Sequence, residues 1–69
     1  MSFTASISDV NIEACKARHA EVQALESRDW LMYGIAKRER QALMQDEMFC
    51  CFDYVAACKE NGVDWKGSL

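Results

Sequence analysis

Apolar and half-apolar residues recur at helical spacing along the first half of the chain. They lie three to five residues apart, at Ile12, Cys15, His19, Val22, Leu25, Trp30 and Tyr33. Just before them stand Ser8 and Asp9, whose side-chain oxygens can accept hydrogen bonds from the free amides at the start of a helix. The pattern predicts one continuous helix over residues 10–33.

The second half carries the most regular pattern in the chain. Five residues fall on one line of a helix, at spacings of four, three, four and three: Met44, Met48, Cys51, Val55 and Cys58. We therefore expect a second helix over residues 36–60. It should end at Gly62-Val63, because glycine accepts the left-handed conformation of a helix stop and the hydrophobe after it folds back onto the last turn.

Two positions compete for the break between these helices. Gly34-Ile35 has the glycine-then-hydrophobe form of a stop and is the break we prefer. The competing break is at residues 27–29, where Ser27 can cap a new helix. A break at Gly34 gives two helices of similar length with a very short link, which favours an antiparallel helical hairpin. Residues 1–7 and 64–69 are expected to form a flexible arm and an irregular tail.

The second predicted helix carries more apolar surface than one neighbouring helix can cover. Large exposed apolar patches usually mark association sites, so we expect two hairpins to form an all-α homodimer with the architecture of a four-helix bundle. The residues assigned to the core or to the dimer contact are Met44, Met48, Phe49, Cys51, Phe52 and Val55. The alternative is a three-helix monomer with breaks near residues 27 and 46.

Composition narrows the class of protein further. The 69 residues include no proline and three glycines, which favours long helices within a single small domain covering residues 1–69. The net charge of −3 does not favour binding to duplex DNA. Residues 1–6 contain no basic region and no long apolar stretch, so we expect a cytoplasmic protein that does not enter a membrane. Its four cysteines are then expected to be reduced thiols.

Metal binding is the first candidate chemistry. Cys15 and His19 are four residues apart and share a helix face. In the hairpin, position 15 lies opposite position 54 and position 19 opposite position 50, which brings Cys50 and Cys51 near His19. Zinc takes thiolate and imidazole ligands, so a zinc-stabilised domain is one alternative. Zinc sites usually contain close ligand pairs such as C-x-x-C, however, and their absence here leads us to expect no metal and no cofactor.

Catalysis and nucleic-acid binding are weaker interpretations. A cysteine nucleophile needs a base and a group that orients this base, and Cys15 with His19 is the single local pair. Glycine-rich phosphate loops are also absent, so we expect no enzymatic activity. Lys37, Arg38 and Arg40 would contact phosphates in a small nucleic-acid-associated regulator, but charge runs of this kind are more often a solvated helix face.

Three aromatic residues indicate a protein partner. Trp30, Tyr33 and Trp65 lie near the ends of the predicted elements, where a small protein has difficulty burying them. Tryptophan and tyrosine are enriched in interface hot spots. We therefore interpret the chain as a protein–protein interaction module and assign these three side chains to partner binding.

The chain also has an overall likeness to a class of phage proteins. Its length, its compact helical sequence and its ending Cys-Lys-Glu-Asn-Gly-Val-Asp-Trp-Lys at residues 58–66 resemble the small accessory proteins encoded in early regions of temperate, lambda-like bacteriophages. The resemblance implies a modulator of host or phage processes that binds a host protein in the host cytoplasm. It implies no individual site residue.

Overall fold

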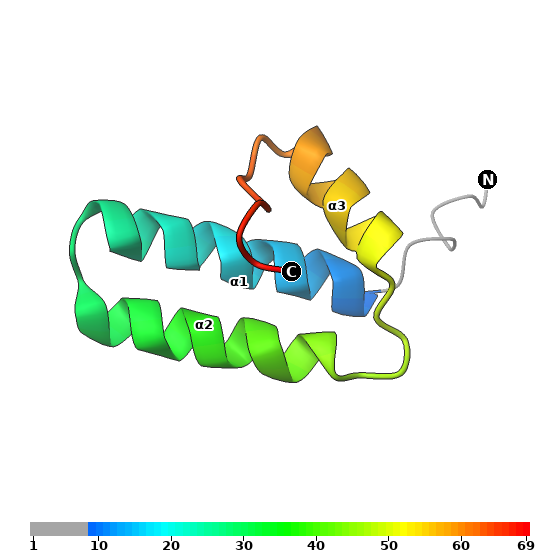
Figure 1. Cartoon of the computed structure of the whole chain (residues 1–69), viewed down its shortest axis with the longest axis horizontal. Helices are drawn as coiled ribbons and strands as arrows, with labels where there is room; N and C mark the ends of the chain where they lie inside the picture. The colour runs from blue at the N-terminus through cyan, green and yellow to red at the C-terminus, as the bar shows by residue number, and fades with distance from the viewer. Residues whose placement is uncertain (1–8) are drawn as a thin grey trace.

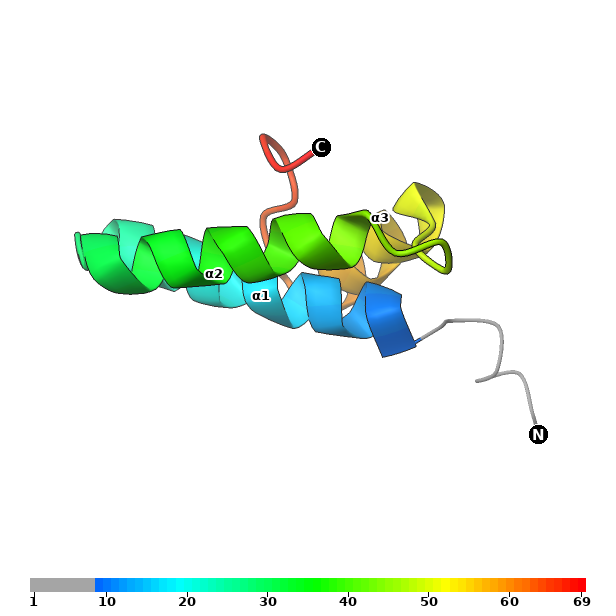
Figure 2. The ribbon, with the colours of Figure 1, turned by 90° about the horizontal axis from the view of Figure 1, so that it is seen from below.

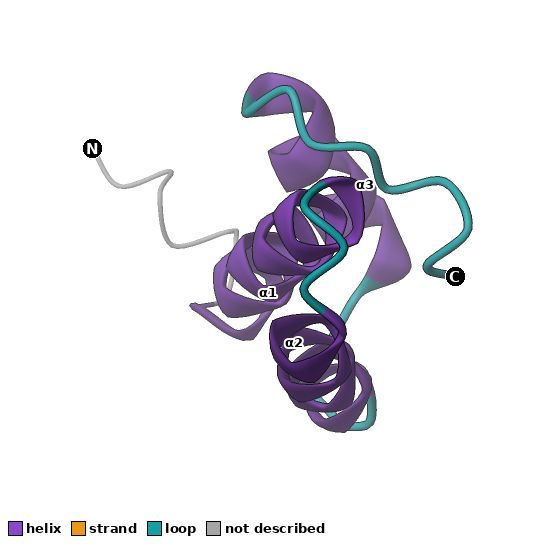
Figure 3. Cartoon of the chain, turned by 90° about the vertical axis from the view of Figure 1, so that its left-hand side faces the viewer, coloured by secondary structure: helices purple, strands orange, loops and turns teal. Residues whose placement is uncertain are grey.

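The computed structural model describes residues 9–69. The regular structure of this part of the chain consists of three helices without a strand: α1 (Asp9–Glu26), α2 (Trp30–Met44) and α3 (Cys51–Glu60). The predicted all-helical class is confirmed. α1 and α2 lie side by side and antiparallel, and α3 packs on the other side of α1 (Figures 1 and 3). The molecule is elongated, with extents of 40 × 23 × 18 Å (Figure 2). The arm expected at residues 1–7 lies outside the described residues.

The first helix break lies at residues 27–29, so the preferred break at Gly34 is wrong and the competing break is confirmed. Arg28 takes the left-handed conformation that glycine usually supplies, with a φ of 56°. Its amide donates a hydrogen bond to the Leu25 carbonyl at 3.2 Å, and the next amide donates to the Ala24 carbonyl at 2.9 Å. These two bonds pair the last carbonyls of α1, so the helix stops here without a glycine.

α2 begins immediately after this stop because Asp29 caps it. The Asp29 side chain accepts a hydrogen bond from the Met32 amide at 3.2 Å and thereby pairs one of the free donors at the helix start. Gly34 then lies in the interior of α2. Because the Asp29 cap directly follows the left-handed Arg28, the whole link between α1 and α2 consists of residues 27–29.

The long second helix expected over residues 36–60 is interrupted between α2 and α3. Asp46 accepts a hydrogen bond from the Met48 amide at 2.8 Å, a local turn that competes with helical pairing. The buried Asn11 on α1 accepts a hydrogen bond from the Cys50 amide at 2.8 Å and holds the start of α3 against α1. The three-helix alternative fits this arrangement of a single chain.

The predicted stop at Gly62-Val63 is confirmed. Gly62 has a φ of 68°, and the Val63 amide donates a hydrogen bond to the Cys58 carbonyl at 2.8 Å. Val63 is thereby folded into the core, which consists of Ala14, Cys15, Tyr54, Ala57, Cys58 and Val63. Cys15 and Tyr54 both belong to this core. The predicted hairpin also placed positions 15 and 54 opposite each other, but in the structure they meet because α3 packs on α1.

The inward face of α1 differs from the expected apolar stripe. Ile12 and Leu25, two members of that stripe, are 38% and 46% exposed. The buried positions on one line of the helix are instead Asn11, Ala14, Arg18 and Glu21. The core side of α1 therefore carries polar side chains, and their partners come from α2, from the start of α3 and from the end of the chain.

Candidate interaction surface

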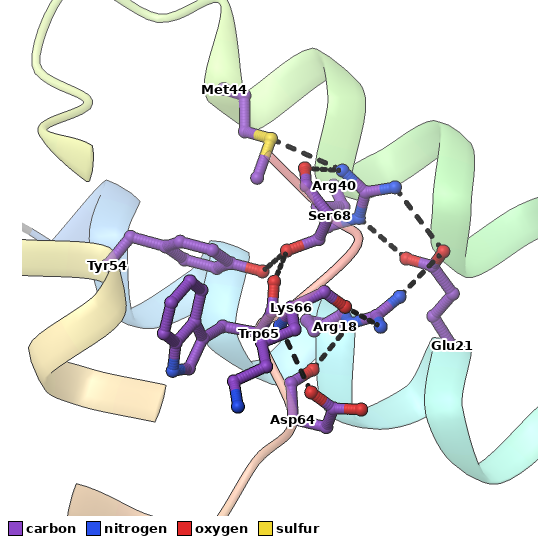
Figure 4. Close-up of polar contacts among 9 residues, drawn as sticks. All are labelled: Arg18, Glu21, Arg40, Met44, Tyr54, Asp64, Trp65, Lys66 and Ser68. Carbon is purple, nitrogen blue, oxygen red and sulfur yellow. Dashed lines mark hydrogen bonds and ion pairs between the residues drawn. The ribbon is translucent and has the colours of Figure 1, made fainter. Parts of the chain in front are cut away.

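The C-terminal tail, residues 61–69, contains turns but no helix, yet α1 holds it in place (Figure 4). Arg18 donates hydrogen bonds from Nε to the Asp64 carbonyl at 2.7 Å and from Nη2 to the Lys66 carbonyl at 3.0 Å. Both acceptors are backbone carbonyls, so Arg18 binds the main chain of the tail. The tail is thus irregular in secondary structure but fixed in position.

Glu21 joins Arg18 to an arginine of α2 (Figure 4). Its carboxylate accepts hydrogen bonds from Arg40 Nε at 2.6 Å and Nη2 at 3.3 Å, and it lies 3.2 Å from Arg18 Nη1. Arg40 Nη1 also donates to the Ser68 carbonyl at 2.8 Å. These three charged side chains are all buried. One carboxylate cannot balance two guanidinium groups, so the tail carbonyls solvate the remaining positive charge.

Tyr54 attaches the tail to α3. Its hydroxyl lies 2.7 Å from Ser68 Oγ, which in turn donates to the Trp65 carbonyl. Tyr54 is fully buried, and this desolvation raises the pKa of its hydroxyl to about 12. Each of the three helices therefore contributes a buried side chain that holds the tail.

The anchored tail forms one wall of an apolar groove along α3. The groove has a volume of about 490 Å³, and it is lined by Cys51, Phe52, Val55, Ala56, Lys59, Trp65 and Leu69. Phe52 is 82% exposed and Leu69 is 64% exposed. The Lys59 ammonium lies 6.0 Å from the centroid of the Trp65 ring, within cation–π range. The groove is thus apolar, open and bordered by one positive charge.

A second apolar surface covers the outer side of α2. Trp30, Leu31 and Ile35 are 61%, 76% and 48% exposed. The Trp30 and Tyr33 rings meet edge to face with their centroids 6.1 Å apart, and Lys37 Nζ lies 5.8 Å from the Tyr33 centroid. Trp30 therefore faces solvent, while Tyr33, which contacts Trp30 and Lys37, is half-buried.

The three aromatic residues predicted to bind a partner fall on separate surfaces. Trp30 and Tyr33 lie on α2, and Trp65 lies on the tail beside α3. Trp65 is half-buried and packs against the core, so part of its ring area is already used within the chain. The three side chains do not form one common binding site.

The predicted core-and-dimer stripe is divided by the fold. Met44, Phe49 and Val55 are partly buried and pack against the core. Met48, Cys51 and Phe52 are exposed, so they do not belong to the core of the single chain, and their assignment to a dimer contact stays a prediction. The break at residues 45–50 turns α3 relative to α2, which ends the continuous line on which the assignment rested.

The predicted basic cluster is also divided. Arg40 is buried against Glu21, and Lys37 lies over the Tyr33 ring. Arg38 is exposed on the outer side of α2. A nucleic-acid surface built from all three residues is therefore wrong, because the Arg40 charge is occupied inside the protein.

The candidate metal ligands are not assembled into one site. Within residues 9–69, no group of three or more histidine, cysteine, aspartate or glutamate side chains has the geometry to hold a metal ion. Cys15 is buried and lines a cavity of about 280 Å³ with His19, while Cys50 and Cys51 belong to the start of α3. Each cysteine of this part of the chain is a free thiol. The zinc hypothesis relied on position 19 lying opposite position 50. That placement required the predicted hairpin with its break at Gly34, which the structure does not have.

Sequence reasoning missed the residues that hold the tail. Arg18, Glu21 and Ser68 received no role, because side chains of these types are mostly exposed in folded proteins. One signal was present: Arg18 and Glu21 are three residues apart and continue the helix line of Asn11 and Ala14. The partners of Arg18 in the tail gave no signal, since they are main-chain carbonyls more than forty residues away.

Comparison with protein-family models, with curated proteins and with solved structures finds no match to this chain. In the described part of the chain, none of the helices has the length and hydropathy that crossing a membrane would require.

Proposed function

We propose that the protein is a protein–protein interaction module and that the groove between α3 and the tail receives apolar side chains of its partner. The observation that carries this proposal is the exposure of Phe52, at 82%, on the edge of an apolar groove. A phenylalanine gains about 1.5–3 kcal/mol on burial, so contact with a partner stabilises a side chain that the isolated chain leaves in water.

The anchoring of the tail supports the same proposal. Trp65 and Leu69 are held beside α3 because Arg18, Arg40 and Tyr54 fix the intervening backbone and Ser68. A groove with fixed walls loses little conformational entropy when a partner binds, which favours affinity. The buried ionic cluster thus has a role in recognition, although it does not contact the partner.

The resemblance to phage accessory proteins supplies the class of partner. We infer that a host protein presents an apolar helix or segment to the groove, and that binding alters the activity of that host protein. Lys59 at the rim favours a partner segment with an acidic residue next to its apolar side chains.

Affinity capture from a bacterial lysate with matched surface variants tests this function. Phe52→Asp puts a charge on the edge of the groove, and Leu31→Asp makes the same kind of change on the outer side of α2. Both side chains are at least 76% exposed, so both variants should fold. We expect a protein that is retained by the wild type and by Leu31→Asp but lost with Phe52→Asp. Equal capture by the wild type and Phe52→Asp contradicts the proposal.

A further inference from the structure

Gly34 occupies a position that the chain itself does not explain. It lies inside α2 and is exposed, and a Cβ atom added to it would meet nothing within 4 Å. The positive φ values recorded for glycines are at Gly62 and Gly67. Glycine destabilises a helix interior relative to alanine, so its use here calls for a reason. One use of glycine in a helix is to let another backbone approach closely, and at Gly34 the open space lies outside the chain.

The residues around Gly34 form a symmetric line on the outer side of α2. Trp30 stands four positions before it and Arg38 four positions after it, so all three share one face of the helix. Trp30 is 61% exposed, and Arg38 is also exposed. Leu31 and Ile35 flank this line and are exposed as well. Trp30 thus places an aromatic ring at one end of this line, and Arg38 places a cation at the other end.

We propose that this face binds a second copy of the chain, with the two α2 helices antiparallel about a two-fold axis at Gly34. In that arrangement, residues at equal distances before and after Gly34 face each other. Trp30 then meets Arg38 of the partner subunit, and the same contact recurs on the other side of the axis. Each pair is a tryptophan ring facing a guanidinium group, a favourable cation–π combination. At the axis, the two glycines let the backbones approach closely.

This self-complementarity is what favours a second copy over another protein. An isologous contact needs a surface that matches itself after a two-fold rotation. The line through Gly34 meets that condition, because its aromatic end fits its cationic end. The inference does not depend on the α3 groove, which lies on a different part of the molecule. It also places self-association on α2, whereas the sequence pattern had assigned it to the stripe around Phe52.

The size of the face sets the expected affinity. Trp30 is the single large aromatic residue on this face, and such a residue buries about 150–250 Å², so the contact area per copy is small. That area is below the roughly 800 Å² per partner of a standard stable interface. We therefore expect a weak dimer with a dissociation constant in the micromolar range.

Sedimentation equilibrium of the full chain tests the proposal. Gly34→Leu fills the point of closest approach and should raise the dimer dissociation constant at least tenfold, which corresponds to about 1.4 kcal/mol. The substitution should leave the helical circular dichroism spectrum intact, because a Cβ at this position meets nothing within 4 Å and leucine has a higher helix propensity than glycine. Arg38→Glu should weaken the dimer, and Arg38→Lys should retain it, because lysine keeps the cation. Phe52→Asp serves as the matched control and should not change self-association.

Three results would overturn the proposal. A wild-type chain that stays monomeric at several hundred micromolar has no such dimer. A Gly34→Leu variant that dimerises like the wild type shows that the helices do not approach at this point. Loss of the dimer in Phe52→Asp but not in Gly34→Leu places the contact on α3. If Phe52→Asp loses its captured partner protein while remaining dimeric, the function of the groove stands separately from this contact.

Discussion

Glu21 on α1 accepts a 2.6 Å hydrogen bond from Arg40 on α2, and both side chains are buried. Arg40 also reaches the Ser68 carbonyl, so this single pair connects the packing of the two long helices to the position of the tail. The apolar groove along α3 depends on that connection, because the tail forms one of its walls.

Replacing Glu21 by alanine should destabilise the protein strongly. The substitution leaves Arg18 and Arg40 buried without their carboxylate, and breaking a buried pair in this way typically costs about 3–5 kcal/mol. Urea unfolding monitored by circular dichroism measures the change. Glu13→Ala is the matched control, because Glu13 pairs with Lys16 on the surface, where an ion pair contributes about 0–1 kcal/mol. Equal stability of the two variants would contradict the role of Glu21.

Replacing Arg18 by methionine should release the tail while the helices remain folded. The variant keeps an aliphatic side chain but loses the hydrogen bonds to the Asp64 and Lys66 carbonyls. We expect exchange of the Ser68 amide with solvent deuterium to become about tenfold faster or more, as expected when local opening is no longer opposed. Lys16→Met removes an exposed charge from the same helix and should leave this rate unchanged. Unaltered protection in the Arg18 variant would show that the arginine does not hold the tail.

Stability should fall steeply in alkaline solution. Burial raises the pKa of Tyr54 from 10.0 to about 12 and the pKa of the Cys58 thiol from 9.0 to about 12. The folded protein keeps these protons after the unfolded chain has released them. The stabilising contribution is therefore complete below pH 9 and is lost as the pH rises to 12. Urea unfolding from pH 8 upward measures the slope, which should be shallower in Tyr54→Phe. A wild type whose free energy of unfolding is the same at high pH as at pH 8 is inconsistent with these pKa shifts.

The four thiols should react in a defined order. Cys51 is exposed, Cys50 is half-buried, and Cys15 and Cys58 are buried. A thiol reagent such as Ellman's should therefore modify Cys51 first in the native protein, and Cys15 and Cys58 only on unfolding, because the reactive thiolate must form and be reached. Cys51→Ser should remove the fast phase, and the denatured wild type should titrate with four thiols. Fast reaction of more than one thiol in native Cys51→Ser would contradict the burial of Cys15 and Cys58.

Local signals in the sequence were sufficient for the helix ends that use common chemistry. The stop at Gly62 was predicted because a glycine followed by valine pairs the last carbonyls of α3 through bonds within a few residues. The stop at Arg28 has the same geometry, but arginine seldom adopts a positive φ, so the pattern pointed to Gly34 instead. The interruption at residues 45–50 was given only as an alternative, because a turn made by Asp46 is compatible with the helical spacing on both sides.

The amino-acid sequence by itself determined the helical class, the helix stop at Gly62 and the regular line of apolar residues in the second half. These features depend on contacts between residues at most five positions apart. Only the tertiary structure decided which side of each helix faces inward, because a buried arginine is stable only where distant atoms pair it. The oxygen partners of Arg18 and Arg40 are the Glu21 carboxylate and three carbonyls of the tail, and most of them lie far away along the chain. The groove along α3 requires the anchored tail, and the exposure of Phe52 follows from the packing of Tyr54, Ala57 and Cys58 in the core, so no local pattern contained them.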